Sequence, residues 1–152
     1  MKLGFIGTGN MASAIMDGII KHGMIPASEI IGSALSEAGR ARARQKFGIH
    51  VTASNTEVAE SADILILSVK PQFYADVIQE IKEHVNDRQI VITIAPGKTL
   101  AWLREQFGKD VKIIRTMPNT PAMAGAGMTA MCPGEHLQEE DISYAISLLE
   151  SF

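Results

Sequence analysis

The chain has 152 residues, of which 46% are hydrophobic, and its formal net charge is −3. This length and composition suit one globular domain with its own core, and the small net charge argues against nucleic-acid binding, which needs a strongly basic face. No stretch approaches the roughly 20 apolar residues of a membrane span. The single cysteine, Cys132, excludes an internal disulfide and suits the cytoplasm, and the four scattered histidines predict no metal site.

Short apolar runs alternate with helical patterns along the chain. The predicted strands cover 2–6, 29–33, 49–52, 63–68, 89–94 and 111–115. The predicted helices cover 10–22, 36–47, 55–61, 72–85, 99–107 and 138–151. This alternation, with continuous apolar runs in the fourth and fifth strands, is typical of parallel strands buried on both faces. The fold class is therefore predicted to be α/β, a doubly wound Rossmann-type and mostly parallel sheet with helices on both faces.

The first predicted strand leads into a glycine turn. Residues 2–12 read KLGFIGTGNMA, so that Gly7-x-Gly9-x-x-Ala12 stands between a strand and a helix. Gly7 permits the tight turn, Gly9 lets a pyrophosphate approach the backbone, and Ala12 still allows close helix–strand packing. The N–H groups at the helix start favour anionic phosphates. A plain strand-to-helix turn is the simpler alternative, but the context favours a dinucleotide-binding turn.

The residues after the second predicted strand favour NADP over NAD. NAD-binding domains carry an acid at the end of this strand, whereas residues 32–36 read GSALS. The arginines that follow suit a 2′-phosphate, and the first 50 residues carry six Lys or Arg against three Asp or Glu. Arg40, nearest the helix start, is the candidate phosphate ligand. Arg42 and Arg44 are interpreted as a solvated helix face.

Four predicted strand exits carry unusual residues. They are 7–10 (GTGN), 69–71 (VKP), 95–97 (APG) and 117–121 (MPNTP), each expected to lead from a strand into a helix. Proline fixes φ and biases the residue before it to extended geometry, so that it stiffens a loop. Ligands of open parallel sheets bind beyond the carboxyl ends of the strands. The four exits therefore predict one rigid-walled crevice.

The stretch RTMPNTPA at 115–122, followed by GAGMT at 125–129, resembles the pyrroline-5-carboxylate reductases, as do FIGTGNM at 5–11 and VKP at 69–71. The resemblance runs over the whole chain. It implies an NAD(P)H-dependent oxidoreductase that reduces 1-pyrroline-5-carboxylate to L-proline, the last step of proline biosynthesis. The implied cofactor is NADP(H), with NAD(H) possible. The implied partner is the small-molecule substrate, with no nucleic acid and no membrane.

The resemblance also implies the cofactor contacts. The pyrophosphate is expected on 6–11, the adenosine ribose near Ser33 and Asn55, and the nicotinamide half at the later exits. The cofactor-binding residues implied in this way are Ile6, Gly7, Thr8, Gly9, Asn10, Met11, Ser33, Asn55, Val69, Lys70, Pro71, Ala95, Pro118 and Asn119. Two departures stand out: Ala34 where relatives often have a polar residue, and Pro96 where the family usually has alanine.

Asn119 is the candidate catalytic residue, as a polar group touching the nicotinamide side. The alternative is that Asn119 bonds backbone groups of its own loop, and Thr120 has a weaker claim. Lys70 is expected to act through its backbone. Cys132 is expected to be a small core residue, and the stripe Ile142, Ala145, Ile146 and Leu149 is expected to face the core.

The family's second domain, a helical bundle that forms the dimer and holds most substrate contacts, has no counterpart in residues 1–152. The chain is therefore expected to be the NAD(P)-binding half, with little or no activity alone, and the full-length protein a homodimer or higher homo-oligomer through the other domain. Two alternatives stay open: a non-catalytic NADP-binding module, and a related β-hydroxyacid dehydrogenase with a Gly/Ser-rich signature in place of MPNTPA. A related cyclic imine is an alternative substrate.

Overall fold

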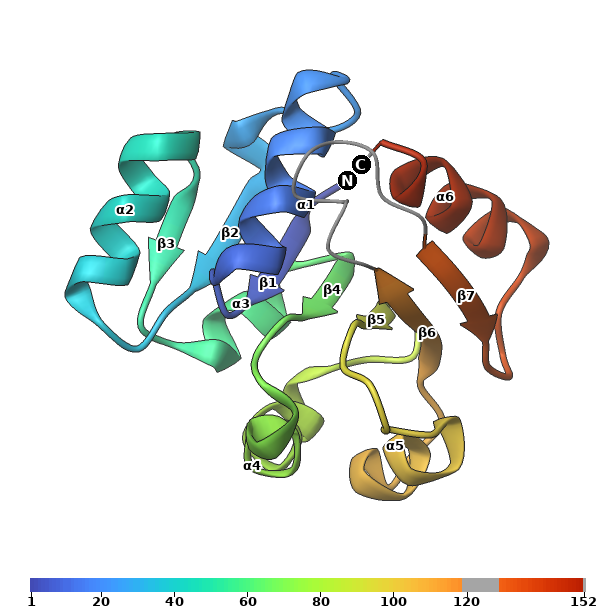
Figure 1. The fold of residues 1–152 in the computed structure, drawn as a ribbon. Coiled ribbons are helices and arrows are strands. Elements are labelled where there is room, and N and C mark those ends of the chain that lie inside the picture. The colour runs from blue at the N-terminus through green and yellow to red at the C-terminus, as the bar shows by residue number, and fades with distance from the viewer. Residues whose placement is uncertain (119–128, 152) are drawn as a thin grey trace.

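The computed structural model describes residues 1–118 and 129–151. Figure 1 shows a twisted sheet with helices on both sides, α2 and β3 at one end and α6 and β7 at the other. The strands are β1 (Leu3–Ile6), β2 (Ile30–Ser33), β3 (His50–Thr52), β4 (Ile64–Leu67), β5 (Ile90–Thr93), β6 (Lys112–Pro118) and β7 (Thr129–Pro133). The helices are α1 (Asn10–Lys21), α2 (Glu37–Phe47), α3 (Asn55–Ser61), α4 (Tyr74–Ile81), α5 (Leu100–Phe107) and α6 (Glu139–Leu149). Three short 3-10 helices are η1 (Ala27–Glu29), η2 (Pro71–Phe73) and η3 (Lys82–His84).

The strand order is β3-β2-β1-β4-β5-β6-β7. All neighbouring pairs from β3 to β6 are parallel. The chain builds outward from β1 through β2 to β3, then returns to place β4 on the other side of β1. The order therefore reverses between β1 and β4, which is where ligands bind in such sheets. The predicted doubly wound fold is confirmed.

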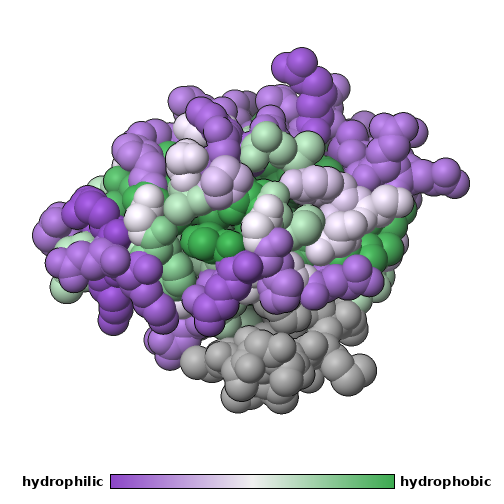
Figure 2. Space-filling model, turned by 90° about the horizontal axis from the view of Figure 1, so that it is seen from above, coloured by the Kyte–Doolittle hydropathy of each residue, from purple (hydrophilic) through white to green (hydrophobic). Residues whose placement is uncertain are grey.

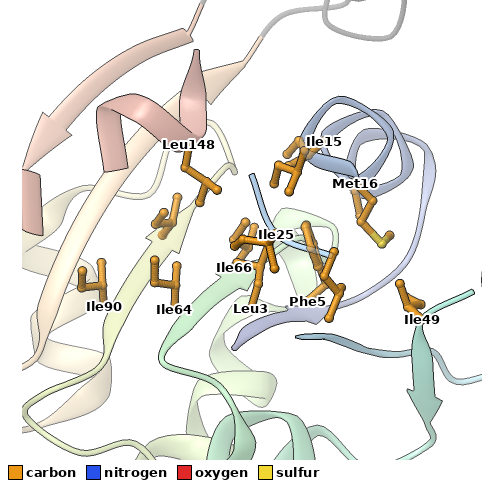
Figure 3. Packing of buried hydrophobic residues seen from close by; sticks show 14 of the residues in the cluster. Leu3, Phe5, Ile15, Met16, Ile25, Ile49, Ile64, Ile66, Ile90 and Leu148 are labelled. Atoms are coloured by element: carbon orange, nitrogen blue, oxygen red, sulfur yellow. The ribbon is translucent and has the colours of Figure 1, made fainter. Parts of the chain in front are cut away.

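Two apolar clusters fill the space on either side of the sheet. Helices α1, α2 and α6 cover one face, and α3, α4 and α5 cover the other. Ile64 and Ile66 point to the first face while Leu65 and Leu67 point to the second, because successive strand residues alternate. Figure 3 shows the first cluster, with side chains of β1, β4 and β5 packed against those of α1 and α6. The continuous apolar runs of the sequence are thus strands buried on both faces.

The carboxyl-terminal part departs from prediction in three ways. Strand β6 pairs antiparallel with β7, and no strand was predicted at β7. Cys132 lies on β7 and is exposed, so the expected core position is wrong. In α6, Ala145 and Leu148 are buried while Ile146 is 41% exposed. The core-facing side of this helix is therefore rotated from the predicted stripe.

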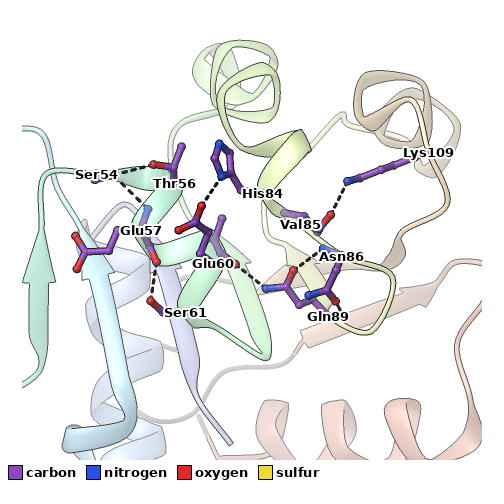
Figure 4. A network of polar contacts seen from close by, with 11 residues as sticks. Ser54, Thr56, Glu57, Glu60, Ser61, His84, Val85, Asn86, Gln89 and Lys109 are labelled. Atoms are coloured by element: carbon purple, nitrogen blue, oxygen red, sulfur yellow. Dashed lines mark hydrogen bonds and ion pairs between the residues drawn. The ribbon is translucent and has the colours of Figure 1, made fainter.

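A polar network near the amino ends of β4 and β5 joins α3 to the segment before β5 (Figure 4). Gln89 Nε2 donates to Ala59 O at 2.6 Å and to Ala62 O at 2.5 Å, and its own Oε1 accepts from Asn86 N at 2.7 Å. His84 Nδ1 lies 2.6 Å from Glu60 Oε1. The amino ends of the strands lie opposite the strand exits, so we interpret this network as structural.

The surface is not uniformly polar. Figure 2 shows the molecule from above the view of Figure 1, with apolar side chains in the middle of this face and hydrophilic side chains around them. Within the described part of the chain, no helix is long and apolar enough to cross a membrane.

Candidate functional site

The glycine turn lies at the carboxyl end of β1, where the strand order reverses. Gly7 has φ +96°, and a Cβ there would lie 3.1 Å from both Ser68 O and Val69 Cγ1. Only glycine fits this backbone without strain. Gly7 N donates to Ser33 O at 3.1 Å, and Ser68 Oγ donates to Gly7 O at 2.7 Å and Ile6 O at 3.0 Å. The turn is thereby tied to β2 on one side and to the β4 exit on the other.

The space in front of α1 is open. Gly9 is the N-cap residue of α1, no side chain caps the helix, and its first turn carries no acid. A Cβ on Gly9 would meet nothing within 4 Å, and Gly9 and Asn10 are exposed. The first backbone N–H groups of a helix have no intrahelical acceptor, and the helix dipole favours an anion beside them. These residues therefore fit the pyrophosphate of a dinucleotide.

Ser33 and Asn55, predicted near the adenosine ribose, are in direct contact. Ser33 Oγ donates to Asn55 Oδ1 at 2.6 Å, although 22 residues separate them. Ser33 is only 2% exposed, while Asn55 is half-buried at the start of α3. Asn55 Nδ2 donates to Glu80 Oε2 of α4 at 3.1 Å. Sequence reasoning missed Glu80, because nothing in the sequence places α4 beside the start of α3.

Arg40 folds back onto the loop between β2 and α2. Its Nη1 donates to Ala34 O at 2.8 Å and Leu35 O at 3.0 Å, and its Nη2 lies 2.8 Å from Glu37 Oε2. The Arg40 side chain is 17% exposed. The predicted phosphate ligand is thus at the expected place, but its guanidinium already bonds the loop. Arg42 and Arg44, interpreted from the sequence as a solvated helix face, are both exposed.

The exits of β4 and β5 lie next to the glycine turn. Val69 Cγ1 lies beside Gly7, 3.1 Å from the place where a Cβ would be. The carbonyl of Lys70 accepts a hydrogen bond from Phe73 N at 3.0 Å, and the Lys70 side chain is exposed. Pro71 is half-buried at the start of η2, and Ala95 is 3% exposed after β5. The backbone role of Lys70 toward a cofactor stays a prediction.

A buried tyrosine, which the sequence did not reveal, holds these two exits together. Tyr74 is fully buried, its hydroxyl donates to Leu67 O, and it accepts from Ile94 N at 3.3 Å. Burial raises the pKa of Tyr74. Backbone hydrogen bonds at Ile94 and Ala95 lower this pKa by less, so the net shift is upward. The hydroxyl therefore stays protonated and bridges the ends of β4 and β5. The sequence signal that could have predicted this bridge is a tyrosine three residues after Pro71.

The fourth exit is described only in part. Thr116 is fully buried, and its Oγ1 donates to Thr93 O at 2.8 Å, which fixes β6 on β5 just before the exit. Pro118 is the last residue of β6. Asn119, the candidate catalytic residue, and Thr120 lie outside the described residues, so their roles stay predictions.

A groove lies between α1 and α2 beside the glycine turn, with a volume of about 190 Å³. It is lined by Thr8, Gly9, Asn10, Ser13, Ala14, Asp17, Arg42, Ala43, Lys46 and Phe47. Across residues 1–118 and 129–151, no three His, Cys, Asp or Glu side chains gather as metal ligands would.

The reversal of strand order at a glycine turn, with an open helix N-terminus beyond it, defines the class of Rossmann-type dinucleotide-binding domains. Consistent with this class, a model of the family described as "NADP oxidoreductase coenzyme F420-dependent" matches residues 2–97. The chain belongs to this family.

Relatives with longer chains share its whole length. The pyrroline-5-carboxylate reductase of Escherichia coli (strain K12) is 40% identical over 151 residues, which are 99% of this chain and 56% of that protein. A solved pyrroline-5-carboxylate reductase from Coxiella burnetii matches with a TM-score of 0.94 at 32% identity, over 99% of this chain and 56% of that one. The solved Plasmodium falciparum pyrroline carboxylate reductase, with NADP bound, has a TM-score of 0.88 at 29% identity, over 99% and 55%. The chain thus spans about half the length of the curated relatives it matches.

Proposed function

We propose that the chain is the NADP(H)-binding half of a pyrroline-5-carboxylate reductase, the enzyme that reduces 1-pyrroline-5-carboxylate to L-proline. The observation that carries the proposal is the open glycine turn at the reversal of strand order, with Gly9 leaving space in front of α1. The similarity to reductases over 99% of the chain, together with the RTMPNTPA stretch, supports the choice of reaction.

Each end of the crevice has residues that suit one part of the dinucleotide. The backbone N–H groups that begin α1 would hold the pyrophosphate. Ser33 and Asn55 would hold the adenosine ribose, and Val69, Lys70, Pro71 and Ala95 would line the nicotinamide half. The reduced nicotinamide supplies the hydride when bound.

Reduction of a protonated cyclic imine needs positioning more than acid–base chemistry, because the C=N⁺ group is already electrophilic. The chain contributes walls with fixed contacts: Pro71 restricts the backbone at one exit, and Tyr74 bonds the ends of β4 and β5 to each other. Asn119 is our candidate for a polar contact beside the nicotinamide. A proton is needed at the imine nitrogen, and we assign its delivery to groups outside the described residues or to water.

The whole protein's properties are part of the same proposal. Substrate contacts and a homodimer or higher homo-oligomer would come from a second, helical domain of the kind implied by the resemblance. The single cysteine supports a cytoplasmic location.

The first test is a titration of this chain with NADPH and with NADH. Calorimetry gives the affinities, and energy transfer from the only tryptophan, Trp102, to the reduced nicotinamide gives an independent signal. Gly9→Ala is the matched variant, because its methyl group meets no protein atom within 4 Å but occupies the space in front of α1. We expect saturable binding by the native chain and at least about tenfold weaker binding by the variant, with the circular dichroism spectrum unchanged.

Two results would contradict the proposal. The first is a folded native chain that binds neither dinucleotide. The second is a Gly9→Ala variant that binds as well as the native chain, because the pyrophosphate would then lie elsewhere. In a protein that includes the proposed second domain, addition of 1-pyrroline-5-carboxylate with NADPH separates the two enzyme alternatives: oxidation of NADPH indicates a reductase, and a β-hydroxyacid that is oxidised with NADP⁺ instead indicates the related dehydrogenase.

A further inference from the structure

We propose that Glu37 limits the preference of this chain for NADPH over NADH, by holding one arm of Arg40 and placing a carboxylate beside the 2′ position of the cofactor. The inference rests on the proposed function, since it concerns the adenosine end of the same crevice. It assigns a specificity-determining role to a residue that neither the glycine turn nor the reductase motifs single out.

The geometry of Arg40 is the starting point. Nη1 of a guanidinium carries two hydrogens, and the bonds to Ala34 O at 2.8 Å and Leu35 O at 3.0 Å use both of them. These carbonyls belong to the two residues directly after Ser33, which ends β2. Arg40 therefore fixes the loop that follows the ribose site, and its Nη1 is not available to a phosphate unless the loop opens.

The other arm of Arg40 is held by Glu37. Nη2 lies 2.8 Å from Glu37 Oε2, and Glu37 is the first residue of α2. The Glu37 side chain is 76% exposed whereas that of Arg40 is 17% exposed. An ion pair with one exposed partner is weakly held, so a 2′-phosphate can compete for Nη2. The phosphate must then either displace the carboxylate or bind next to it.

The charges decide which cofactor is affected. A 2′-phosphate carries up to two negative charges, and a carboxylate at the start of α2 repels it at close range. The ribose of NADH has a neutral 2′-hydroxyl, which suffers no such repulsion and can donate to a carboxylate. Glu37 therefore weakens NADPH binding selectively.

The test is the ratio of NADPH to NADH affinity in Glu37→Gln and in a control, Glu105→Gln. Both substitutions remove one exposed acid, but Glu105 lies on α5, on the opposite face of the sheet from α2. We expect Glu37→Gln to raise the ratio by about three- to tenfold at low salt, mainly through tighter NADPH binding, and less at high salt. Glu105→Gln should leave the ratio unchanged. The pair 2′,5′-ADP and 5′-AMP should show the same change as the dinucleotides, because they contact only the adenosine end.

Arg40→Gln should change the ratio of NADPH to NADH affinity in the opposite direction. Loss of the cation leaves Glu37 unpaired, so the NADPH to NADH ratio should fall, and both affinities should weaken as the loop loses its bonds. An unchanged ratio in Glu37→Gln overturns the inference, as does an equal rise in Glu105→Gln, which would indicate a general charge effect. Failure of native chain and variants to bind any dinucleotide overturns the proposed function along with it, whereas binding with an unchanged ratio overturns this inference alone.

Discussion

The two ends of the candidate crevice are built in different ways. At the glycine turn the backbone forms the site: Gly7 adopts φ +96°, Gly9 leaves open space, and no side chain caps α1. At the end proposed for the adenosine, side chains form the candidate site. Ser33 bonds Asn55, Asn55 bonds Glu80, and Arg40 bonds the loop after β2.

The two constructions tolerate substitution differently. A backbone site depends on the absence of side-chain atoms, so that a single methyl group can block it or strain it. A site of bonded side chains depends on partners from several elements. Removal of one side-chain group therefore lowers its stability by about the free energy of one hydrogen bond. Substitutions at the two ends should therefore differ in size and in kind.

The largest expected effect is that of Gly7→Ala. Alanine is strained at φ +96°, and its Cβ would lie 3.1 Å from Ser68 O and Val69 Cγ1. We expect the free energy of unfolding, measured by urea denaturation, to fall by about 2–4 kcal/mol. Gly48→Ala is the control for strain alone, because Gly48 has φ +70° with nothing within 4 Å of a Cβ. It should cost about 1 kcal/mol, and an equal loss in both variants would show that the contact with Ser68 and Val69 contributes nothing.

Tyr74→Phe tests whether side chains also matter near the backbone-built end. Removal of the hydroxyl leaves Leu67 O and Ile94 N without this buried partner. The free energy of unfolding should fall by about 1–3 kcal/mol, because buried polar groups that lose a partner are costly. Tyr144→Phe on α6, where the side chain is only half-buried, should change it by about 0.5 kcal/mol or less. Equal stability of the two variants would mean that the exits of β4 and β5 do not depend on this bridge.

Ser33→Ala probes the side-chain end. The variant loses the 2.6 Å bond to Asn55 Oδ1, but the Asn55 amide keeps its bond to Glu80. We expect a loss of about 1 kcal/mol in the free energy of unfolding, together with weaker binding of both NADPH and NADH. Ser147→Ala on the exposed side of α6 serves as the control for a serine hydroxyl. Unchanged cofactor affinity in Ser33→Ala would remove Ser33 from the proposed ribose site.

The smallest effect is expected outside the crevice, at the start of α6. Partial burial raises the pKa of Asp141, but the Gln138 N–H and the Lys112 ammonium, 2.9 Å away, lower it more, so that the net pKa lies below the ordinary value. A carboxyl whose pKa is lowered by folding stabilises the fold above its unfolded pKa and loses this contribution as the pH falls below about 4. Asp141→Asn should therefore flatten the decline of stability in acid, by about 1 kcal/mol or less. Thermal unfolding scans at several pH values measure this, and parallel pH profiles of native chain and variant would contradict it.

The sequence predicted the backbone-built end well. The glycines, the strand before them and the helix after them are local in the chain, and each has a steric reason that can be read from residue type. Five of the strand-and-helix units were predicted near their observed bounds because apolar runs of this kind have few other ways to be buried. Strand β7 was missed because it lies at the edge of the sheet, where Cys132 is exposed and no apolar run is needed.

The side-chain end was predicted only in outline. Ser33 and Asn55 were expected near the same ribose, but their bond, the part of Glu80 and the bond from Tyr74 to the β4 exit depend on how α3 and α4 pack on the sheet. Arg40 could be placed near the start of α2, yet its partners Ala34 and Leu35 follow from the path of a loop, which residue types do not specify.

The fold class and the position of the glycine turn could thus be predicted from residue types alone, because strand burial and glycine sterics act within a few residues. The partners of Ser33 and Asn55, and the bonds that already occupy the guanidinium of Arg40, became visible in the folded structure alone. Those contacts join residues from different helices and strands, and their distances are set by packing of the whole sheet.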